Sequence, residues 1–295
     1  MSRHETSLAH AARIERVVAH IADHLDSALD LEGLAAIACF SPWHFHRVYV
    51  AITGETVADT VRRLRLHRAA VDLNRTALPI GRIGRRAGYG SVAAFTRAFA
   101  ADYGTPPAAW RRHGQGLRPD GLKHGDVKMP NAAPAYRTPV HYDVTIETIE
   151  AQTLIAVSHL GDYQEIGKAF DRLMVWAGPR GLMGPQTRFF GIYYDDPASK
   201  PKSELRSEAC ITAPLDIAPG PDMHRQVIAA STVARLVHKG PYADLDVAYA
   251  WLYHNWLPQS GREPGDAPCF EEYLNDPRSL PPQEWLTAVN LPLKG

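Results

Sequence analysis

Hydrophobic positions follow a helical period through the first 113 residues and a strand period after residue 142. Near the N-terminus, apolar residues recur at intervals of three and four, which predicts an amphipathic helix carrying Ile14, Val17, Val18, Ile21 and Leu25. Later runs predict strands at 144–149, 153–160, 188–196, 208–213, 227–230, 232–238, 269–276 and 285–291. Residues 114–141 contain four Gly and four Pro and follow neither period, so we expect a linker there.

Both parts of the chain contain an internal repeat. SPWHFHRVYVAITG (41–54) aligns with SVAAFTRAFAADYG (91–104). In the second part, HLGDYQEIGKAFDRL (159–173) aligns with HKGPYADLDVAYAWL (238–252), and FFGIYYDDP (189–197) aligns with CFEEYLNDP (269–277). We therefore expect two domains, residues 1–113 and 142–295, each built by duplication.

Residues 41–54 carry the signals of a capped helix with two faces. Ser41 suits the N-cap, and Pro42 suits the first helical position, where its missing N–H costs nothing. The apolar face carries Phe45, Val48, Tyr49 and Ile52, and the outer face carries Trp43, His46 and Arg47. A short helix and a tight turn precede it. This is the helix-turn-helix layout, in which the second helix enters the major groove of DNA.

The two histidines of this segment do not predict a metal site. Residues two apart on a helix point ~200° away from each other, so His44 and His46 cannot chelate one ion. We expect His46 to face DNA and assign no chemistry to His44. Trp43 suits either DNA contact or the core, and DNA contact is favoured because the apolar face is already complete.

The second copy, residues 91–104, repeats this layout with Ser91 as the expected N-cap. Its outer face carries Val92, Ala93, Thr96 and Arg97. Arg97 suits a guanine and the others suit a thymine methyl, although positioning of the DNA backbone is an equal alternative. Residues 56–73 predict one long helix that holds the two recognition helices about one DNA turn, ~34 Å, apart.

Charge divides the chain, although its net charge is zero. Residues 1–128 carry 18 Lys and Arg against 12 Asp and Glu, and the remainder carries 14 against 20. A basic part joined to an acidic part suggests a module that binds a polyanion. There is no apolar run near 18 residues and no signal-peptide pattern, so we expect neither membrane association nor export.

Candidate chemistry for catalysis or metal binding is sparse. The three cysteines, Cys39, Cys210 and Cys269, lie far apart and form no CxxC motif, which argues against a disulfide framework and a thiolate zinc site and fits a reducing cytoplasm. No Ser-His-Asp set, metal constellation or phosphate-binding loop is present. We therefore predict a protein that is not an enzyme and needs no cofactor or metal.

The first part resembles the DNA-binding domain of the AraC/XylS family of bacterial transcription regulators. The resemblance rests on SPWHFHRVYVAITG, on PIGRIGRRAGYGSVAAFTRAFAADYG and on TPPAAWRR (105–112). It implies two helix-turn-helix units joined by a long helix. The base-reading positions of the family fall on Trp43, His46 and Arg47 and on Val92, Ala93, Thr96 and Arg97.

The second part resembles the GyrI-like effector-binding domain, a tandem βαββ fold of the SHS2 type. The motifs that carry the resemblance are the two His-x-Gly-x-Tyr segments, YYDDP and FEEYLNDP. It implies a groove for bulky cationic or aromatic molecules with a glutamate as anchor. That glutamate falls on Glu271, with Tyr273 and Tyr193 as aromatic walls. Trp176, Trp251 and Trp256 are candidates for the groove or for the core.

Taken together, the sequence predicts an α+β multidomain protein, with an all-α tandem helix-turn-helix domain followed by an α+β tandem βαββ domain with antiparallel sheets. We expect a cytoplasmic regulator that binds double-stranded promoter DNA and a small-molecule effector, with RNA polymerase as a further candidate partner. Two alternatives remain for the second part: a small-molecule hydrolase using Glu271 and Tyr273, or a protein-interaction domain.

Overall fold

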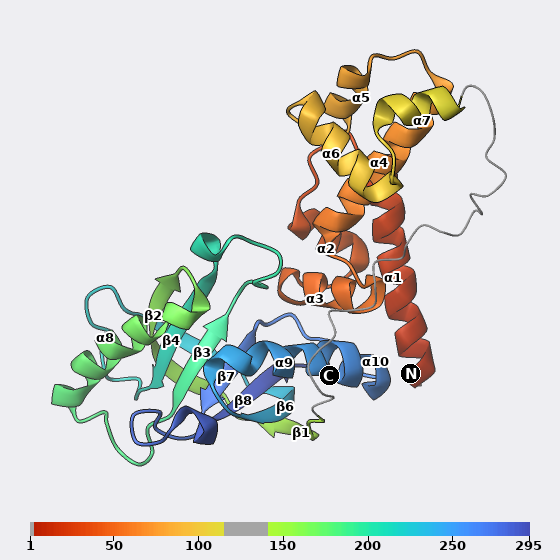
Figure 1. Cartoon of the computed structure of the whole chain (residues 1–295). Coiled ribbons are helices and arrows are strands. Elements are labelled where there is room, and N and C mark those ends of the chain that lie inside the picture. The colour runs from red at the N-terminus through yellow and green to blue at the C-terminus, as the bar shows by residue number, and fades with distance from the viewer. Residues whose placement is uncertain (1–2, 115–140) are drawn as a thin grey trace.

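The computed structural model describes residues 3–114 and 141–295, which form two lobes that lie against each other (Figure 1). One lobe is helical, and the other is built on an antiparallel sheet covered by helices, which confirms the predicted fold class. The predicted linker, residues 114–141, lies almost wholly outside the described residues.

The helical lobe contains two helix-turn-helix units separated by a long helix. Its helices are α1 (Arg3–Asp23), α2 (Leu31–Ala38), α3 (Pro42–Thr53), α4 (Val57–Arg75), α5 (Ile80–Arg86), α6 (Val92–Tyr103) and α7 (Pro107–Gly114). The first unit is α2 and α3, and the second is α5 and α6. Figure 1 shows the second unit at the far end of α4 from the sheet lobe.

The two recognition helices, α3 and α6, are built alike. Each begins after a serine N-cap, Ser41 or Ser91, and the Ser91 side chain accepts a hydrogen bond from the first turn of α6. Each ends at a glycine in the left-handed conformation, Gly54 with φ 75° and Gly104 with φ 68°. Glycine adopts this conformation without strain, so both copies stop at the same place.

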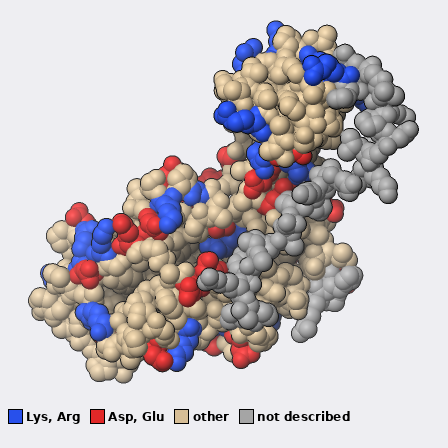
Figure 2. Space-filling model, viewed as in Figure 1, with Lys and Arg blue, Asp and Glu red and all other residues tan. Residues whose placement is uncertain are grey.

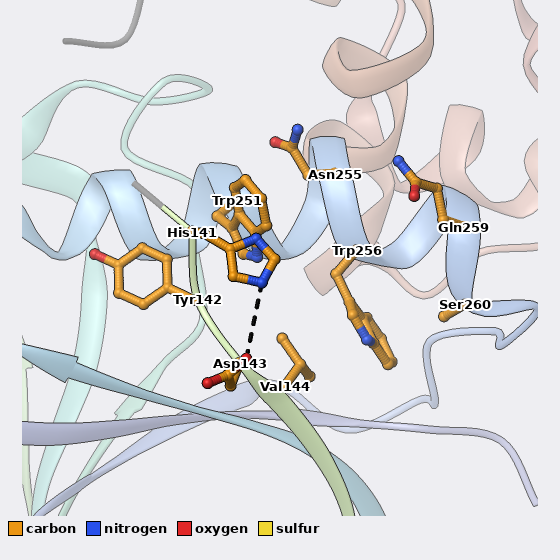
Figure 3. Close-up of a pocket in the computed structure, with 9 residues that line it drawn as sticks. All are labelled: His141, Tyr142, Asp143, Val144, Trp251, Asn255, Trp256, Gln259 and Ser260. Atoms are coloured by element: carbon orange, nitrogen blue, oxygen red, sulfur yellow. Dashed lines mark ion pairs between the residues drawn. The ribbon is translucent and has the colours of Figure 1, made fainter. Parts of the chain in front are cut away.

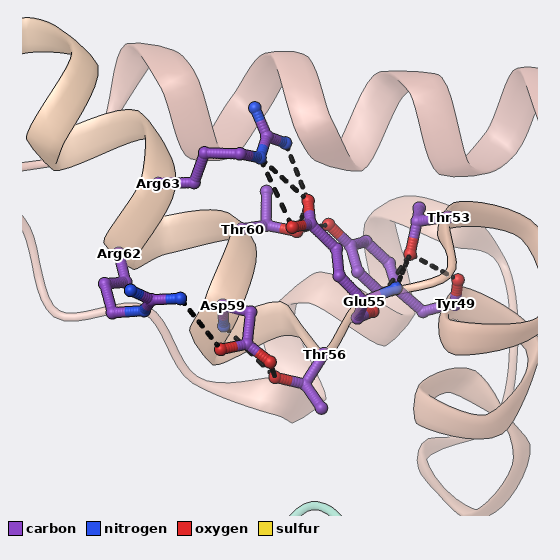
Figure 4. A network of polar contacts seen from close by, with 8 residues as sticks. All are labelled: Tyr49, Thr53, Glu55, Thr56, Asp59, Thr60, Arg62 and Arg63. Atoms are coloured by element: carbon purple, nitrogen blue, oxygen red, sulfur yellow. Dashed lines mark hydrogen bonds and ion pairs between the residues drawn. The ribbon is translucent and has the colours of Figure 1, made fainter. Parts of the chain in front are cut away.

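A buried polar network joins α3 to α4 (Figure 4). Glu55, between the two helices, accepts hydrogen bonds from Arg63 Nη2 at 2.6 Å and from Thr60 Oγ1 at 2.7 Å. Thr60 Oγ1 also lies 2.6 Å from Tyr49 Oη. Because a buried carboxylate is costly without partners, this network favours one angle between α3 and α4.

Each of the eight predicted strands overlaps an observed strand, although the strand predicted at 227–230 lies three residues earlier at its start and ends at residue 228. The eight strands form one continuous sheet. They are β1 (Val144–Ile149), β2 (Gln152–Leu160), β3 (Phe189–Tyr193), β4 (Arg206–Thr212), β5 (His224–Ile228), β6 (Ser231–Lys239), β7 (Cys269–Tyr273) and β8 (Leu286–Pro292). Their order across the sheet is β1-β6-β8-β7-β3-β4-β2-β5, and all neighbours are antiparallel. The two copies of the repeat therefore share a single sheet rather than forming one each.

Helices cover one face of this sheet. In the first copy α8 (Gly167–Ala177) follows β2. In the second copy α9 (Leu245–Ala250) follows β6 and continues through a π-helical segment, Trp251–Trp256, into α10 (Leu257–Ser260). The repeated units are thus β2-α8-β3-β4 and β6-α9-β7-β8, with β1 and β5 at the edges.

Short connections show that the sheet is curled. β1 and β2 lie toward opposite ends of the strand order, yet only residues 150–151 separate them, and only residues 229–230 separate β5 from β6. Since each residue spans at most ~3.5 Å, the two ends of the sheet must approach each other. The face without helices is filled by Leu154, Ala156, Phe190, Ile192, Cys210, Ile228, Val233 and Phe270.

One apolar core crosses from the helical lobe into the sheet lobe. Val17 of α1 and Phe45 of α3 belong to the same buried cluster as Leu252 and Tyr253 of the π-helical segment and Leu291 of β8. Figure 1 shows α1 and α3 beside α9 and α10. The boundary between the lobes is therefore packed like the interior of a domain, which brings α3 directly onto the sheet lobe.

Candidate functional site

Glu271 lies at the centre of the sheet, on the face covered by helices, among three tyrosines. Its Oε1 accepts a hydrogen bond from Tyr249 Oη and its Oε2 accepts one from Tyr273 Oη, each at 3.1 Å. Tyr273 Oη also lies 2.8 Å from Tyr193 Oη. We call Glu271, Tyr193, Tyr249 and Tyr273 the cage. Glu271 is 3% exposed, so the cage is closed in this structure.

Burial raises the pKa of Glu271 to about 7, because a carboxylate loses its hydration there. The tyrosine hydroxyls and the Arg47 guanidinium oppose this rise by stabilising the ionised form. The carboxyl is therefore divided between its neutral and ionised forms near neutral pH. A cation placed beside it would favour the ionised form, and the aromatic rings would add cation–π attraction.

Strand alternation in β7 decides which side chains reach the cage. Cys269 and Glu271 face the helices, since they contact Tyr253 and Tyr249, and Tyr273 faces them too, since it packs against Phe170 of α8. The intervening residues face the other side, where Phe270 joins the second core and Glu272 pairs with two arginines. This is the alternation that the sequence predicts.

The repeat places the cage on its own symmetry axis. Residue 191 of β3 pairs with residue 271 of β7, and these are also equivalent positions of the two copies. Phe170 and Tyr249 are likewise equivalent, on α8 and α9. Phe170 packs edge-on against Tyr273, with ring centroids 5.3 Å apart. Since glycine stands opposite Glu271, the duplicated site carries a single acidic group.

The helix above the sheet carries tyrosines from the cage toward the helical lobe. Tyr249 lies in α9 and Tyr253 in the following π-helical segment. Pro258, just beyond, has no N–H to bond the carbonyl four residues earlier, which favours the wider helical turn here. Tyr253 Oη lies 3.3 Å from Cys269 Sγ and 2.6 Å from Nδ1 of His44 on α3.

An aspartate beside the cage contacts the recognition helix α3. Asp196, in the turn after β3, places Oδ2 2.8 Å from His46 Nδ1 and Oδ1 4.0 Å from Arg47 Nη1. Burial acts to raise the pKa of Asp196, but the Arg47 guanidinium and His46 outweigh it and hold this pKa below its usual range. Asp196 is therefore an anion bound by two side chains of α3.

Arg47 also contacts the cage itself. Its guanidinium carbon lies 4.5 Å from the ring centroid of Tyr249 and 5.7 Å from that of Tyr253. A guanidinium over an aromatic face gains cation–π attraction, more so where water is largely excluded. The Arg47 side chain is 18% exposed, so a predicted DNA-reading group is bound between a carboxylate and an aromatic ring.

Other residues at the start of α3 bind the sheet lobe as well. The fully buried His44 uses both ring nitrogens: Nδ1 accepts from Tyr253 Oη, and Nε2 donates to the Ala267 carbonyl at 2.9 Å. Burial lowers the pKa of His44 to about 4, which keeps the ring neutral at neutral pH. Ser41 Oγ donates to the Gly265 carbonyl at 3.4 Å. Trp43 packs edge-on against Tyr194.

Comparison with known proteins identifies both lobes. Residues 142–294 match the GyrI-like small molecule binding domain family, and residues 34–113 match a helix-turn-helix domain family. The chain belongs to the GyrI-like family. It is a DNA-binding regulator that joins an AraC-type helix-turn-helix domain to a GyrI-like domain, so both resemblances predicted from the sequence are confirmed.

Relatives cover different parts of the chain. A DNA gyrase inhibitor of Edwardsiella piscicida is 34% identical over 161 residues, which are 51% of this chain and 97% of that protein. The right origin-binding protein of Escherichia coli K12 is 38% identical over 111 residues, 36% of this chain and 38% of that protein. The crystal structure of the EcmrR C-terminal domain is 20% identical, with a TM-score of 0.44, and covers 52% of this chain and 99% of that one.

The GyrI-like domain covers the α3 face that the sequence predicts to be open. Trp43, His46 and Arg47 lie on one side of α3, as predicted, but that side contacts the GyrI-like domain. The expectation that these three side chains point outward is therefore wrong for this conformation. Helical periodicity identifies a polar face but does not say whether water, DNA or another domain meets it.

The equivalent face of α6 is open. Val92, Ala93 and Arg97 are exposed and Thr96 is half-buried. On the face shown in Figure 2, the lobe that holds α5–α7 carries basic groups with little acidic surface between them. Its exposed arginines include Arg82, Arg85, Arg86 and Arg97. This surface has the charge that phosphate contacts require.

The structure does not bring the three predicted tryptophans to the cage. Trp176 packs into the cluster between α8 and the sheet, with the Arg180 guanidinium 4.9 Å from its ring centroid. Trp251 and Trp256 line a separate open pocket of about 510 Å³ (Figure 3). That pocket also contains Tyr142. A ligand role for these two residues stays a prediction.

Sequence reasoning missed Tyr249, Asp196 and His44. Tyr249 aligns with Phe170 in the repeat, which was the available signal for a second aromatic wall, but helical aromatics usually indicate core. Asp196 aligns with Asp276, so the alignment gave no reason to separate them. Within residues 3–114 and 141–295, no three His, Cys, Asp or Glu side chains are placed to hold a metal ion. No helix of these ranges is long and apolar enough to span a membrane.

Proposed function

We propose that this chain is a sequence-specific transcription regulator that responds to a small cationic, aromatic effector. The observation that carries the proposal is the cage. Glu271 is a buried carboxylate surrounded by three tyrosines, and no cationic side chain of residues 3–114 and 141–295 lies within hydrogen-bond distance of it. A buried carboxylate among aromatic rings is suited to a desolvated organic cation, which supplies both charge and apolar surface.

We propose that both recognition helices read promoter DNA. On α6 the contacts would come from Val92, Ala93, Thr96 and Arg97, whose face is already accessible. On α3 they would come from Trp43, His46 and Arg47 once the GyrI-like domain has moved away. Two reading units in one chain let a single molecule contact two successive turns of the major groove.

We propose that the cage binds its ligand without converting it. Glu271 is 3% exposed and each of its oxygens accepts a tyrosine hydroxyl, so the closed cage gives a water molecule little access to this carboxyl group. As a DNA-binding regulator the protein would act in the cytoplasm, and RNA polymerase is the further partner we propose, since transcription initiation is what such a protein controls. The proposed domains are residues 1–113 and 142–295, joined by 114–141.

DNA reading is tested with a duplex of about 40 base pairs enriched from a randomised library by the full-length protein. Arg97→Ala should weaken binding to this duplex by about 1–3 kcal/mol and weaken binding to a scrambled duplex much less. Arg47→Ala should lower the ratio of the two affinities by the same margin, since any release of α3 acts on both duplexes alike. For every duplex, affinity should fall steeply with salt as counterions are released. Equal losses on both duplexes would overturn base reading by that residue.

Effector binding is tested by thermal shift with tetraphenylphosphonium and a panel of other cationic aromatic compounds. Stabilisation of the wild type that Glu271→Gln abolishes supports the cage as the site. Uniform melting curves across the panel contradict it and favour a protein-interaction role for the GyrI-like domain. Turnover of an electrophilic ester that Glu271→Gln abolishes would favour a hydrolase instead.

A further inference from the structure

We propose that the GyrI-like domain captures the DNA-reading arginine Arg47, so that a cation entering the cage and DNA both favour release of α3. In the captured state, Arg47 lies between Asp196 and the ring of Tyr249, and the first helix-turn-helix unit cannot read DNA. This inference rests on the proposed function, because it takes α3 as a DNA-reading helix and the cage as the effector site.

Capture of α3 by the GyrI-like domain and DNA reading by α3 exclude each other. The start of α3 is held to the GyrI-like domain by His44, His46 and Arg47. A recognition helix uses its N-terminal residues to reach base edges, so the same side of α3 cannot lie in a major groove at the same time. Arg97, the counterpart of Arg47 on α6, is exposed, so only the first unit is covered.

Arg47 is bound in the way that an organic cation would be bound. Its guanidinium lies on the Tyr249 ring at 4.5 Å and beside the Asp196 carboxylate at 4.0 Å. A cationic aromatic effector would seek the same combination of an aromatic face and a nearby carboxylate. The captured arginine therefore occupies part of the binding surface that the cage offers to a cation.

The cage must open to admit a ligand. Tyr249 contacts Arg47 with its ring and donates its hydroxyl to Glu271, so it lies between the two. The Tyr273 hydroxyl donates to the other carboxylate oxygen of Glu271. A cation that reaches Glu271 has to displace at least one of these hydroxyls, and displacement of Tyr249 removes the ring on which Arg47 rests.

Only one copy of the repeat contributes its turn aspartate to the capture, among the described residues. Asp196 and Asp276 are equivalent, and each accepts a hydrogen bond from the backbone N–H two residues later. Asp276 is exposed and pairs with Arg278 of its own turn, whereas the Asp196 side chain is 11% exposed and contacts α3. The shared turn does not need the contact with α3, so the two aspartates form a matched pair for experiment.

The apparent affinity for DNA depends on the fraction of molecules in which α3 is free. If only a fraction of molecules has α3 free, the apparent Kd for DNA exceeds the intrinsic Kd by the inverse of that fraction. Weakening the capture should therefore tighten DNA binding even though no DNA contact is added. The Asp196→Asn substitution keeps a side-chain oxygen for the hydrogen bond from the Ala198 N–H and removes the charge that binds Arg47.

The experiment compares full-length wild type, Asp196→Asn and Asp276→Asn on the enriched duplex, by fluorescence anisotropy at one salt concentration. Asp196→Asn should bind about 3- to 10-fold more tightly, because the free fraction rises, and Asp276→Asn should match the wild type. Glu263→Gln is a second variant, since Glu263 pairs with Arg13 at 3.0 Å across the same boundary. Among the described residues its other ion-pair partner is Lys294, so neither partner is a DNA-reading residue. This variant should also tighten binding, and it carries the test if Asp196→Asn does not fold.

A second set of anisotropy measurements is made in the presence of tetraphenylphosphonium. This cation should tighten DNA binding of the wild type and have less effect on Asp196→Asn, in which the capture is already weakened. Unchanged DNA affinity in both Asp196→Asn and Glu263→Gln overturns the capture, even if the cation binds and DNA is read as proposed. If no cation of the panel binds, the effector proposal fails, while tighter DNA binding by the two variants still supports the capture.

Discussion

Gly191 and Glu271 are paired across β3 and β7, where the two copies of the repeat meet. A Cβ atom on residue 191 would lie 2.8 Å from Tyr193 Cε2 and 2.8 Å from Tyr273 Oη, closer than such atoms approach in proteins. The glycine thus leaves the space in which two tyrosines close over the carboxylate. The difference between these two equivalent positions turns a symmetric fold into a site with one acidic group.

Gly191→Ala should therefore destabilise the protein by about 1–3 kcal/mol, because the added methyl group forces the cage tyrosines apart. Urea denaturation measures this loss. Gly184→Ala is the control, since a Cβ there meets nothing within 4 Å. Similar stabilities for the two variants would show that the cage is not packed as described.

The raised pKa of Glu271 predicts a pH-dependent stability. Burial raises this pKa from 4.5 to about 7, so the folded protein binds the proton more tightly than the unfolded chain does. The resulting stabilisation is complete below pH 4.5 and is lost as the pH rises through 7. The unfolding free energy of the wild type, minus that of Glu271→Gln, should fall by on the order of 3 kcal/mol over this window.

The neighbouring Glu272 provides a control of opposite sign. Burial acts to raise its pKa, but ion pairs with Arg188 and Arg235 outweigh this and lower it. Its stabilisation is therefore present above its ordinary pKa and lost as the pH falls. The difference between wild type and Glu272→Gln should rise with pH while that for Glu271→Gln falls. Parallel curves for the two variants contradict the assignment of Glu271.

Effector affinity should follow the same titration. A cation favours the ionised carboxylate, so binding of tetraphenylphosphonium to the wild type should strengthen between pH 6 and pH 8, around the pKa of about 7. Calorimetry at several pH values measures this change. Affinity that stays constant across this range would place the ligand away from Glu271.

The Glu55 network predicts a purely structural effect in the helical lobe. Glu55→Ala leaves Arg63 and Thr60 without their buried acceptor, so it should lower the unfolding free energy by about 1–3 kcal/mol. Glu55 lies between α3 and α4 and away from the cage. The affinity for the cation should therefore be unchanged under conditions in which the variant is fully folded. A loss of cation affinity in a folded Glu55→Ala protein would contradict this separation.

The fold was largely predictable because its signals are local. Caps, turns and apolar periods identified α3, α4 and α6, and the alternation of β7 placed Glu271 and Tyr273 on one face. The repeat also aligned Gly191 with Glu271, and the structure pairs these two residues near the centre of the sheet. These features depend on residues that are near each other or on duplicated copies.

The relation between the lobes was not predictable from such signals. Arg47 and Arg97 look equivalent in the repeat, and Asp196 and Asp276 do too, yet only the first member of each pair lies at the boundary between the lobes. A polar helical face carries no mark of its partner. The asymmetry arises from tertiary packing, through Tyr253 and the shared apolar core.

If Arg47 is captured as proposed, an effector in the cage and DNA on α3 favour the same open state. Two ligands that favour one state must strengthen each other's binding by the same factor. The most direct measurement is the Kd of tetraphenylphosphonium for the full-length wild type, with and without saturating enriched duplex. We expect DNA to tighten cation binding by the same factor by which the cation tightens DNA binding. An unchanged Kd would contradict this expectation.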